Sequence, residues 1–210
     1  VVGGGYGLLS RLHGLVIDWL TSVSLVHLRD GTPNSITVSR KSTGPQADLF
    51  WAHTGGGGGN FGIITRYEFE NLPDAPISAD IVNYAWDWSV VSSVGPEYLV
   101  RIVRCFESLC STLGNSAFVI LKLTHKDANQ IQLLVQDVKN QSPGTLANKI
   151  QSKLQEFNIA GTSKKLLSVA GHPFQSSLVP EQHLTWWQAV YELSGSGGPW
   201  NGKYKSAYMR

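Results

Sequence analysis

The chain has 210 residues, of which 42% are hydrophobic and 15% are charged, and its formal net charge at pH 7 is +2. This apolar content is enough for one or two packed domains, which excludes a disordered chain or a collagen-like repeat. The 17 basic and 15 acidic residues form no run of like charge, so we expect no nucleic-acid partner. No stretch approaches about 20 uninterrupted apolar residues, so we also expect no membrane partner.

The chain begins at Val1 with no initiator methionine and no signal peptide, and it ends at Arg210 directly after a strand-like segment at 203–208. We therefore expect a fragment of a longer polypeptide.

The first 72 residues combine glycine clusters with short β-branched runs. Leucines after the first glycine cluster predict a short helix that ends at Gly14. A second helix of one or two turns is expected at 48–52, with Asp48 as its N-cap. Strands are expected at 16–18, 21–28, 35–39 and 63–69.

Pro73 and Pro76 mark the clearest boundary, because prolines three apart break both a helix and a strand ladder. Beyond it the pattern predicts strands at 81–88, 117–125 and 130–138, with a turn at 126–129, and helices at 96–113, 146–157 and 182–193. Paired strands with helices between them favour an antiparallel β-sheet covered by helices, so the fold class is α+β.

Few other residues indicate a site. Cys105 and Cys110 lie five apart on an expected helix and point in different directions, so we expect small core or interface residues rather than a disulfide. The histidines are scattered without the i, i+4 spacing of a helical zinc site, so we expect no metal and assign them structural or surface roles. Trp86 and Trp88 would share one strand face, either lining a ligand cleft or, as we favour, packing in the core. A core position is also expected for Trp187 and its neighbour on the last helix.

Two glycine clusters are the strongest local signal. Five consecutive glycines at 55–59 are costly to order, so they indicate either a loop that approaches an anion or a flat cofactor, or a tight turn. The cluster at 3–7 opens a helix, where backbone amides can bind a phosphate. It is not the dinucleotide fingerprint, because Leu8 stands at the last glycine position. A further hypothesis, a nucleotide-binding domain without redox chemistry, has only these two clusters in its favour.

Three ordered segments carry a resemblance to a known family. They are GGGYGLLSRLHGL at 3–15, DLFWAHTGGGGGNFGIITR at 48–66, and GSG at 195–197 followed by GKYKSAYM at 202–209. Together they resemble the FAD-linked oxidases of the berberine-bridge-enzyme type, particularly fungal members. This type is a branch of the vanillyl-alcohol-oxidase flavoproteins, which have a PCMH-type FAD-binding domain.

The resemblance implies two domains. Residues 1–72 would be the later part of a PCMH-type FAD-binding domain, and 73–210 an incomplete substrate-binding domain. It also implies FAD contacts, mostly through the backbone, at Gly3, Gly4, Gly5, Tyr6, Gly7, Asn60, Gly62, Ile63 and Ile64. The covalent flavin anchors of the family would lie upstream of Val1, and its catalytic base beyond Arg210, so no catalytic residue is assigned here.

By the same resemblance, we expect a fragment of an oxidase that oxidises an alcohol or hemiacetal, on an oligosaccharide or a secondary metabolite, with O₂ as electron acceptor. The fragment alone is expected to be inactive, and secretion is a family-level expectation. The alternative is a truncated, non-catalytic relative that binds a carbohydrate or another ligand. Nothing in the sequence indicates an oligomeric state.

Overall fold

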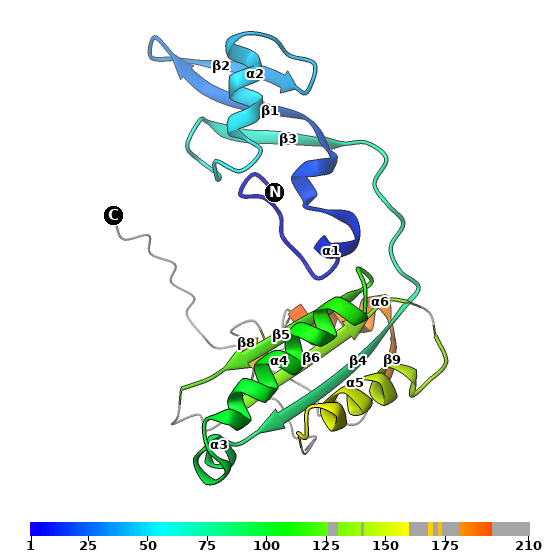
Figure 1. Cartoon of the computed structure of the whole chain (residues 1–210). Helices are drawn as coiled ribbons and strands as arrows, with labels where there is room; N and C mark the ends of the chain where they lie inside the picture. Colours follow the sequence, from blue (N-terminus) through cyan, green and yellow to red (C-terminus); the bar gives the residue numbers. More distant parts are fainter. Residues whose placement is uncertain (126–129, 140, 160–167, 170–171, 174–180, 195–210) are drawn as a thin grey trace. The chain divides into compact units, whose positions relative to one another are not determined.

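A computed structural model describes residues 1–125, 130–139, 141–159, 168–169, 172–173 and 181–194. The chain divides into two compact units, Val1–Ala75 and Pro76–Arg210. Each unit has its own antiparallel sheet and its own hydrophobic core (Figure 1). The expected turn at 126–129 and the expected strand at 203–208 lie outside the described residues.

The first unit contains a three-stranded sheet in the order β2-β1-β3, with one short helix packed on it (Figure 1). Asp30 and Gly31 both have positive φ, which suits the tight turn that joins β1 and β2. The buried core consists of Leu20, Val23, Leu25, Val38 and Phe50. The elements are α1 (Ser10–His13), η1 (Val16–Trp19), β1 (Leu20–Arg29), β2 (Thr32–Ser39), α2 (Pro45–Ala52) and β3 (Ile63–Phe69).

Two expectations for this unit are wrong. Residues 16–18 form a turn of 3₁₀ helix rather than a strand, because the Leu15 N–H donates to Asp18 Oδ2 at 2.7 Å and closes the turn. The α2 helix begins at Pro45 rather than at Asp48. Proline suits the first helical position, where its fixed φ is helical and its missing N–H is not needed.

The second unit contains a four-stranded sheet in the order β5-β6-β4-β9. Helices α4 and α5 cover one face, and α6 lies on the other (Figure 1). The main elements are β4 (Ser78–Trp86), α3 (Trp88–Val94), α4 (Glu97–Thr112), β5 (Ala117–Leu123), β6 (Ile131–Asp137), α5 (Thr145–Glu156), β9 (Glu181–Thr185) and α6 (Trp186–Ser194). A separate ladder pairs β7 (Ser168–Val169) with β8 (His172–Pro173).

The core of this unit lies between the sheet and helices α4 and α5. Alternate residues of β4 and β6 point to this side, as the period of two in a strand requires. The central members are Val82, Trp86, Leu133, Val135, Ile102, Cys105, Leu109, Leu146, Ile150 and Leu154. The expected core position of Cys105 is confirmed, and both cysteines are free thiols. No described helix is long and apolar enough to cross a lipid bilayer.

The tryptophans and the last helix correct three expectations for the second unit. Trp88 does not share a strand face with Trp86, because β4 ends at Trp86 and Trp88 begins α3. Trp86 itself is buried in the core. The expected helix at 182–193 begins only at Trp186, because the preceding residues form β9 on the edge of β4. Trp187 is not a core residue, since it is 76% exposed.

Candidate glycine-rich binding site

The two glycine clusters lie next to each other in the first unit. The Gly57 N–H donates to the carbonyl of Val2 at 3.1 Å. Within the second cluster, the Asn60 side chain donates to the Gly56 carbonyl at 2.7 Å. The structure therefore brings together segments more than 50 positions apart, and we call residues 3–7 and 55–59 the glycine surface.

Part of the first cluster is held by the residues that follow it. The carbonyls of Gly4 and Gly5 accept the N–H groups of Ile17 and Val16, at 3.3 and 3.2 Å. Gly5 has a φ of +70°, and a Cβ on it would lie 2.5 Å from the Cβ of Val16. Glycine is therefore required at Gly5 by the packing of η1.

Gly3 and Gly7 differ from Gly5. Neither has a positive φ, and a Cβ on either would meet nothing within 4 Å. Both are exposed, so the chain itself gives no reason for glycine at these positions. The N–H groups of Gly3 and Gly5 also make no hydrogen bond within the described residues. Bare backbone with unused donors is the surface that a closely approaching ligand needs.

The remaining predicted contact residues have distinct environments. Gly62 is structural, because its φ is +145° and a Cβ would lie 2.6 Å from the Val26 carbonyl oxygen. Ile64 packs against the core, whereas Ile63 is 75% exposed on the opposite face of the sheet. Tyr6 is 73% exposed. Of the two isoleucines, only Ile63 thus has its side chain available to a ligand.

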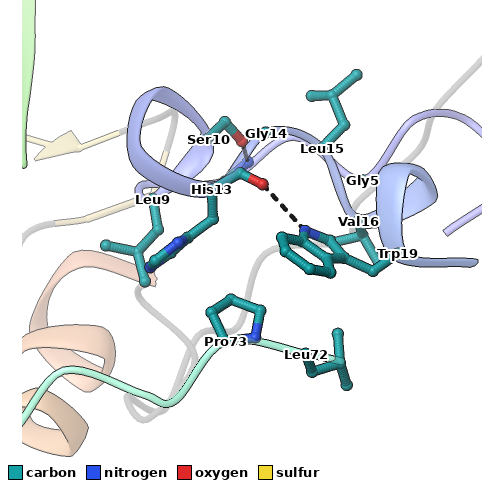
Figure 2. Close-up of a pocket in the computed structure, with 11 residues that line it drawn as sticks. Gly5, Leu9, Ser10, His13, Gly14, Leu15, Val16, Trp19, Leu72 and Pro73 are labelled. Carbon is teal, nitrogen blue, oxygen red and sulfur yellow. Dashed lines mark hydrogen bonds between the residues drawn. The ribbon is translucent and has the colours of Figure 1, made fainter. Parts of the chain in front are cut away.

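An apolar pocket of about 260 Å³ lies beside the first cluster (Figure 2). The Trp19 indole N–H donates to the His13 carbonyl at 2.9 Å, and the Gly7 N–H donates to Ser10 Oγ at 2.8 Å, so α1 and η1 hold the pocket walls together. The lining residues are Gly5, Gly7, Leu9, Ser10, His13, Gly14, Leu15, Val16, Trp19, Leu72 and Pro73. Sequence reasoning missed most of them, because nothing local indicates that Leu72 and Pro73 return to α1.

A second hollow, of about 320 Å³, borders the other cluster. Trp51, Ala52, Thr54, Gly55, Gly56 and Phe61 line it. Next to it, His53 is buried, its Nδ1 lies 2.7 Å from the Leu49 carbonyl oxygen, and its ring centre lies 5.4 Å from that of Phe61. The structural role expected for His53 is therefore confirmed, and the residue ties the second cluster to α2.

These surroundings offer backbone donors and apolar walls. They suit the binding and orientation of a planar ligand with hydrogen-bond acceptors. Among the described residues, no group of three or more His, Cys, Asp or Glu side chains is arranged to hold a metal ion. In the second unit, burial raises the pKa of the Cys105 thiol to about 11, so it stays protonated and unreactive at neutral pH.

Comparisons with known proteins identify relatives along the whole chain. Hexose oxidase from Chondrus crispus is 33% identical over 235 aligned positions, which cover 100% of this chain and 42% of that protein. Berberine bridge enzyme-like 1 from Arabidopsis thaliana is 29% identical over 65% of this chain and 26% of its own length. The crystal structure of aclacinomycin oxidoreductase superposes with a TM-score of 0.71 and 28% identity, covering 94% of this chain and 40% of that one.

The chain belongs to the berberine-bridge-enzyme-like FAD-linked oxidoreductases. No protein-family model matches the sequence. Curated relatives in this family also include oligosaccharide oxidases. The chain spans less than half the length of the curated relatives that it matches. The α+β fold with antiparallel sheets, expected from the sequence, is confirmed by the structure and by its berberine-bridge-enzyme-like structural neighbours.

Proposed function

We propose that this chain contributes two parts of an FAD-dependent oxidase. The first unit is the later part of the PCMH-type FAD-binding domain, and the second is part of the substrate domain. The whole protein oxidises an alcohol or hemiacetal on a saccharide or a secondary metabolite, with O₂ as electron acceptor. The family membership and the names of relatives such as hexose oxidase support this proposal.

The glycine surface carries the cofactor part of the proposal. Gly3 and Gly7 leave bare backbone that the chain itself does not need, so the residues present fit a ligand as flat as a flavin. The unused N–H groups of Gly3 and Gly5 suit its ring carbonyls and nitrogens. The apolar pocket beside α1 suits its hydrocarbon edge. Backbone contacts of this kind depend on the absence of a Cβ more than on side-chain identity.

The chemistry is divided between cofactor and protein. When bound, FAD supplies the hydride acceptor, and O₂ then takes up the electrons. The residues of this chain bind and orient: the glycine surface holds the ring system, and the pocket beside α1 excludes water from one of its edges. From the resemblance to the family, we propose that any covalent flavin attachment lies upstream of Val1 and the catalytic base beyond Arg210. Cys105 is buried in the core of the second unit and is not a candidate anchor.

Flavin content tests the proposal directly. We expect the FAD-loaded protein to lose most of its visible flavin absorbance in Gly3→Val and Gly7→Val, because each adds a branched side chain where the ligand approaches. The unfolding free energy of the FAD-free protein should remain unchanged, because a Cβ at either position meets open space. Ser35→Val is a matched control, at an exposed position of β2.

Two results would count against this assignment. Full flavin retention in both glycine variants would move the cofactor away from the glycine surface. A wild-type protein that binds saccharides but never takes up FAD would instead support a non-catalytic binding protein.

A further inference from the structure

The η1 turn connects the two parts of the candidate cofactor site. The N–H groups of Val16 and Ile17 donate to the carbonyls of Gly5 and Gly4, at 3.2 and 3.3 Å. Val16 and Trp19 also form part of the wall of the apolar pocket beside α1 (Figure 2). A shift of η1 would therefore move the backbone of the first glycine cluster and the pocket wall together.

One side chain from the adjacent sheet holds η1 in place. Arg40 directly follows β2, and its Nε donates to the Leu20 carbonyl at 2.6 Å. Its Nη2 donates to the Ile17 carbonyl at 3.0 Å and also to the Asp18 carbonyl. The backbone N–H of Arg40 donates to the Thr21 carbonyl at 3.0 Å, which fixes the residue to β1. One guanidinium therefore binds three carbonyls in η1 and at the start of β1.

The chemistry of the guanidinium explains why an arginine suits this position. It presents five N–H donors in a planar fork, so it can bind several carbonyls at once. The ammonium of a lysine is a point charge on a flexible chain and cannot hold three acceptors in the same way. Carbonyls at the end of a helical turn lack partners within the turn and carry partial negative charge, which the guanidinium complements.

A surface ion pair does not account for Arg40. The residue is exposed and lines a hollow of about 270 Å³ together with Glu68 and Glu70. Among the described residues, however, Arg40 forms no ion pair, and Glu68 pairs with Arg66 at 2.9 Å instead. The guanidinium of Arg40 is therefore committed to the backbone of η1 and β1 rather than to a charged side chain.

We propose that Arg40 is a positioning residue for the cofactor site. Through η1 it fixes the backbone of Gly4 and Gly5, and with it the unused N–H groups that face the flavin. This deepens the proposed function and rests on it. A reduced flavin ring carries more negative charge than an oxidised one, so N–H donors that are held rigidly favour the reduced form. Loosening η1 should therefore lower the reduction potential of the flavin.

The test removes the planar fork in two ways. Arg40→Lys keeps the charge, whereas Arg40→Gln keeps only an amide donor. In the FAD-loaded protein, each should weaken the preference for reduced over oxidised flavin about tenfold, which lowers the two-electron potential by about 30 mV. Each should also lower the melting temperature of the FAD-free protein, because carbonyls of η1 lose their donor. Lys41→Met removes a charge at the next, exposed position and is the matched control, which should change neither value.

Three other outcomes overturn the proposal. An unchanged flavin potential in both Arg40 variants would reject it and leave the proposed oxidase intact, and a lower melting temperature alongside would make Arg40 a structural residue only. An equal shift of the potential in Lys41→Met would assign the effect to surface charge rather than to the fork. A wild-type protein that takes up no FAD, read by its visible absorbance, would reject the proposed function itself and the role of Arg40 with it.

Discussion

At the scale of single residues, the glycines of the two clusters serve different purposes. We expect Gly5→Ala and Gly62→Ala to lower the free energy of unfolding by about 1–3 kcal/mol each, because the new Cβ would press on Val16 or on the Val26 carbonyl at a positive φ. Urea denaturation of the first unit measures this. Gly7→Ala is the control and should change stability by less than about 0.5 kcal/mol, since its Cβ meets open space. Equal losses at Gly5 and Gly7 would contradict this division.

Cys105 gives a prediction on pH. Burial raises its pKa from an ordinary 9.0 to about 11, with smaller opposing effects of Lys153, which lowers it, and Glu156, which raises it. In the window between these two values the unfolded chain releases the thiol proton and the folded chain keeps it. The contribution of Cys105 to stability is therefore complete below pH 9 and is lost as the pH rises toward 11.

The measurement is the free energy of unfolding at several pH values in that window, for the wild type and for Cys105→Ala. The difference between the two should shrink as the pH rises. A difference that stays constant would mean that the thiol titrates alike in both states.

Residue-level prediction from the sequence worked where chemistry is local. The core role of Cys105 follows from helical spacing, and it is confirmed. The side-chain amide of Gln136, which is buried without a hydrogen-bond partner among the described residues, could not be predicted in the same way. The amide has no partner because Ile81 and Phe118 face it on the two neighbouring strands. The register of these strands depends on how they pair, so it cannot be predicted from one segment alone.

At the scale of elements, β9 and α5 are joined by one side chain. Glu181 Oε1 accepts the Gly144 N–H at 2.7 Å, and Oε2 accepts the Ala147 N–H at 2.6 Å. Gly144 is the N-cap of α5 and Ala147 lies in its first turn, so the carboxylate satisfies free N–H groups at the start of the helix and complements the helix dipole. We expect Glu181→Ala to cost about 1–2 kcal/mol of unfolding free energy, measured by thermal or urea denaturation.

The same helix provides the control for Glu181. Glu156 forms an ion pair with Lys153 at 2.7 Å, but its side chain is 57% exposed, so Glu156→Gln should change stability by less than about 0.5 kcal/mol. A second reporter is Tyr84, whose pKa is raised by burial and also by the charge of Glu181. Glu181→Gln should lower the Tyr84 pKa in an ultraviolet titration. If Glu181→Gln lowered the stability but left the Tyr84 pKa unchanged, the charge of Glu181 would not act on Tyr84.

Errors in the predicted elements have a shared cause. The sequence predicts a helix from residue 182, but residues 181–185 form β9 because β4 offers a free edge there. Residues 16–18 were assigned to a strand, but the carbonyls of Gly4 and Gly5 and the Asp18 side chain hold them in a 3₁₀ turn. In both places a partner distant along the chain, or a single hydrogen bond, overrides local propensity. The elements at 63–69 and 97–112 carry strong periodicity and match closely.

At the scale of the whole molecule, the order of the sequence motifs along the chain predicted the family, which no single helix or strand could do. The glycine clusters alone did not decide between a cofactor-binding loop and a tight turn. The segments around them, taken in their order along the chain, predicted the family, and the relatives confirm it. The pocket beside α1 could not be predicted, because it needs Leu72 and Pro73 to return to the start of the chain. A motif depends on residues that are close in the sequence, whereas a pocket depends on how distant segments pack, so the motif can be predicted from the sequence and the pocket cannot.

The two units have separate cores, which gives a prediction for the whole chain. Leu25 is buried in the first core and Leu133 in the second, so truncating either to alanine should cost about 2–5 kcal/mol within its own unit. In native-state hydrogen exchange, Leu25→Ala should speed exchange in β1–β3 and spare β4–β6, whereas Leu133→Ala should do the reverse. Each variant is the other's control. Faster exchange across both sheets in either variant would show that the units unfold as one cooperative body, and the division at Ala75 would then have no energetic meaning.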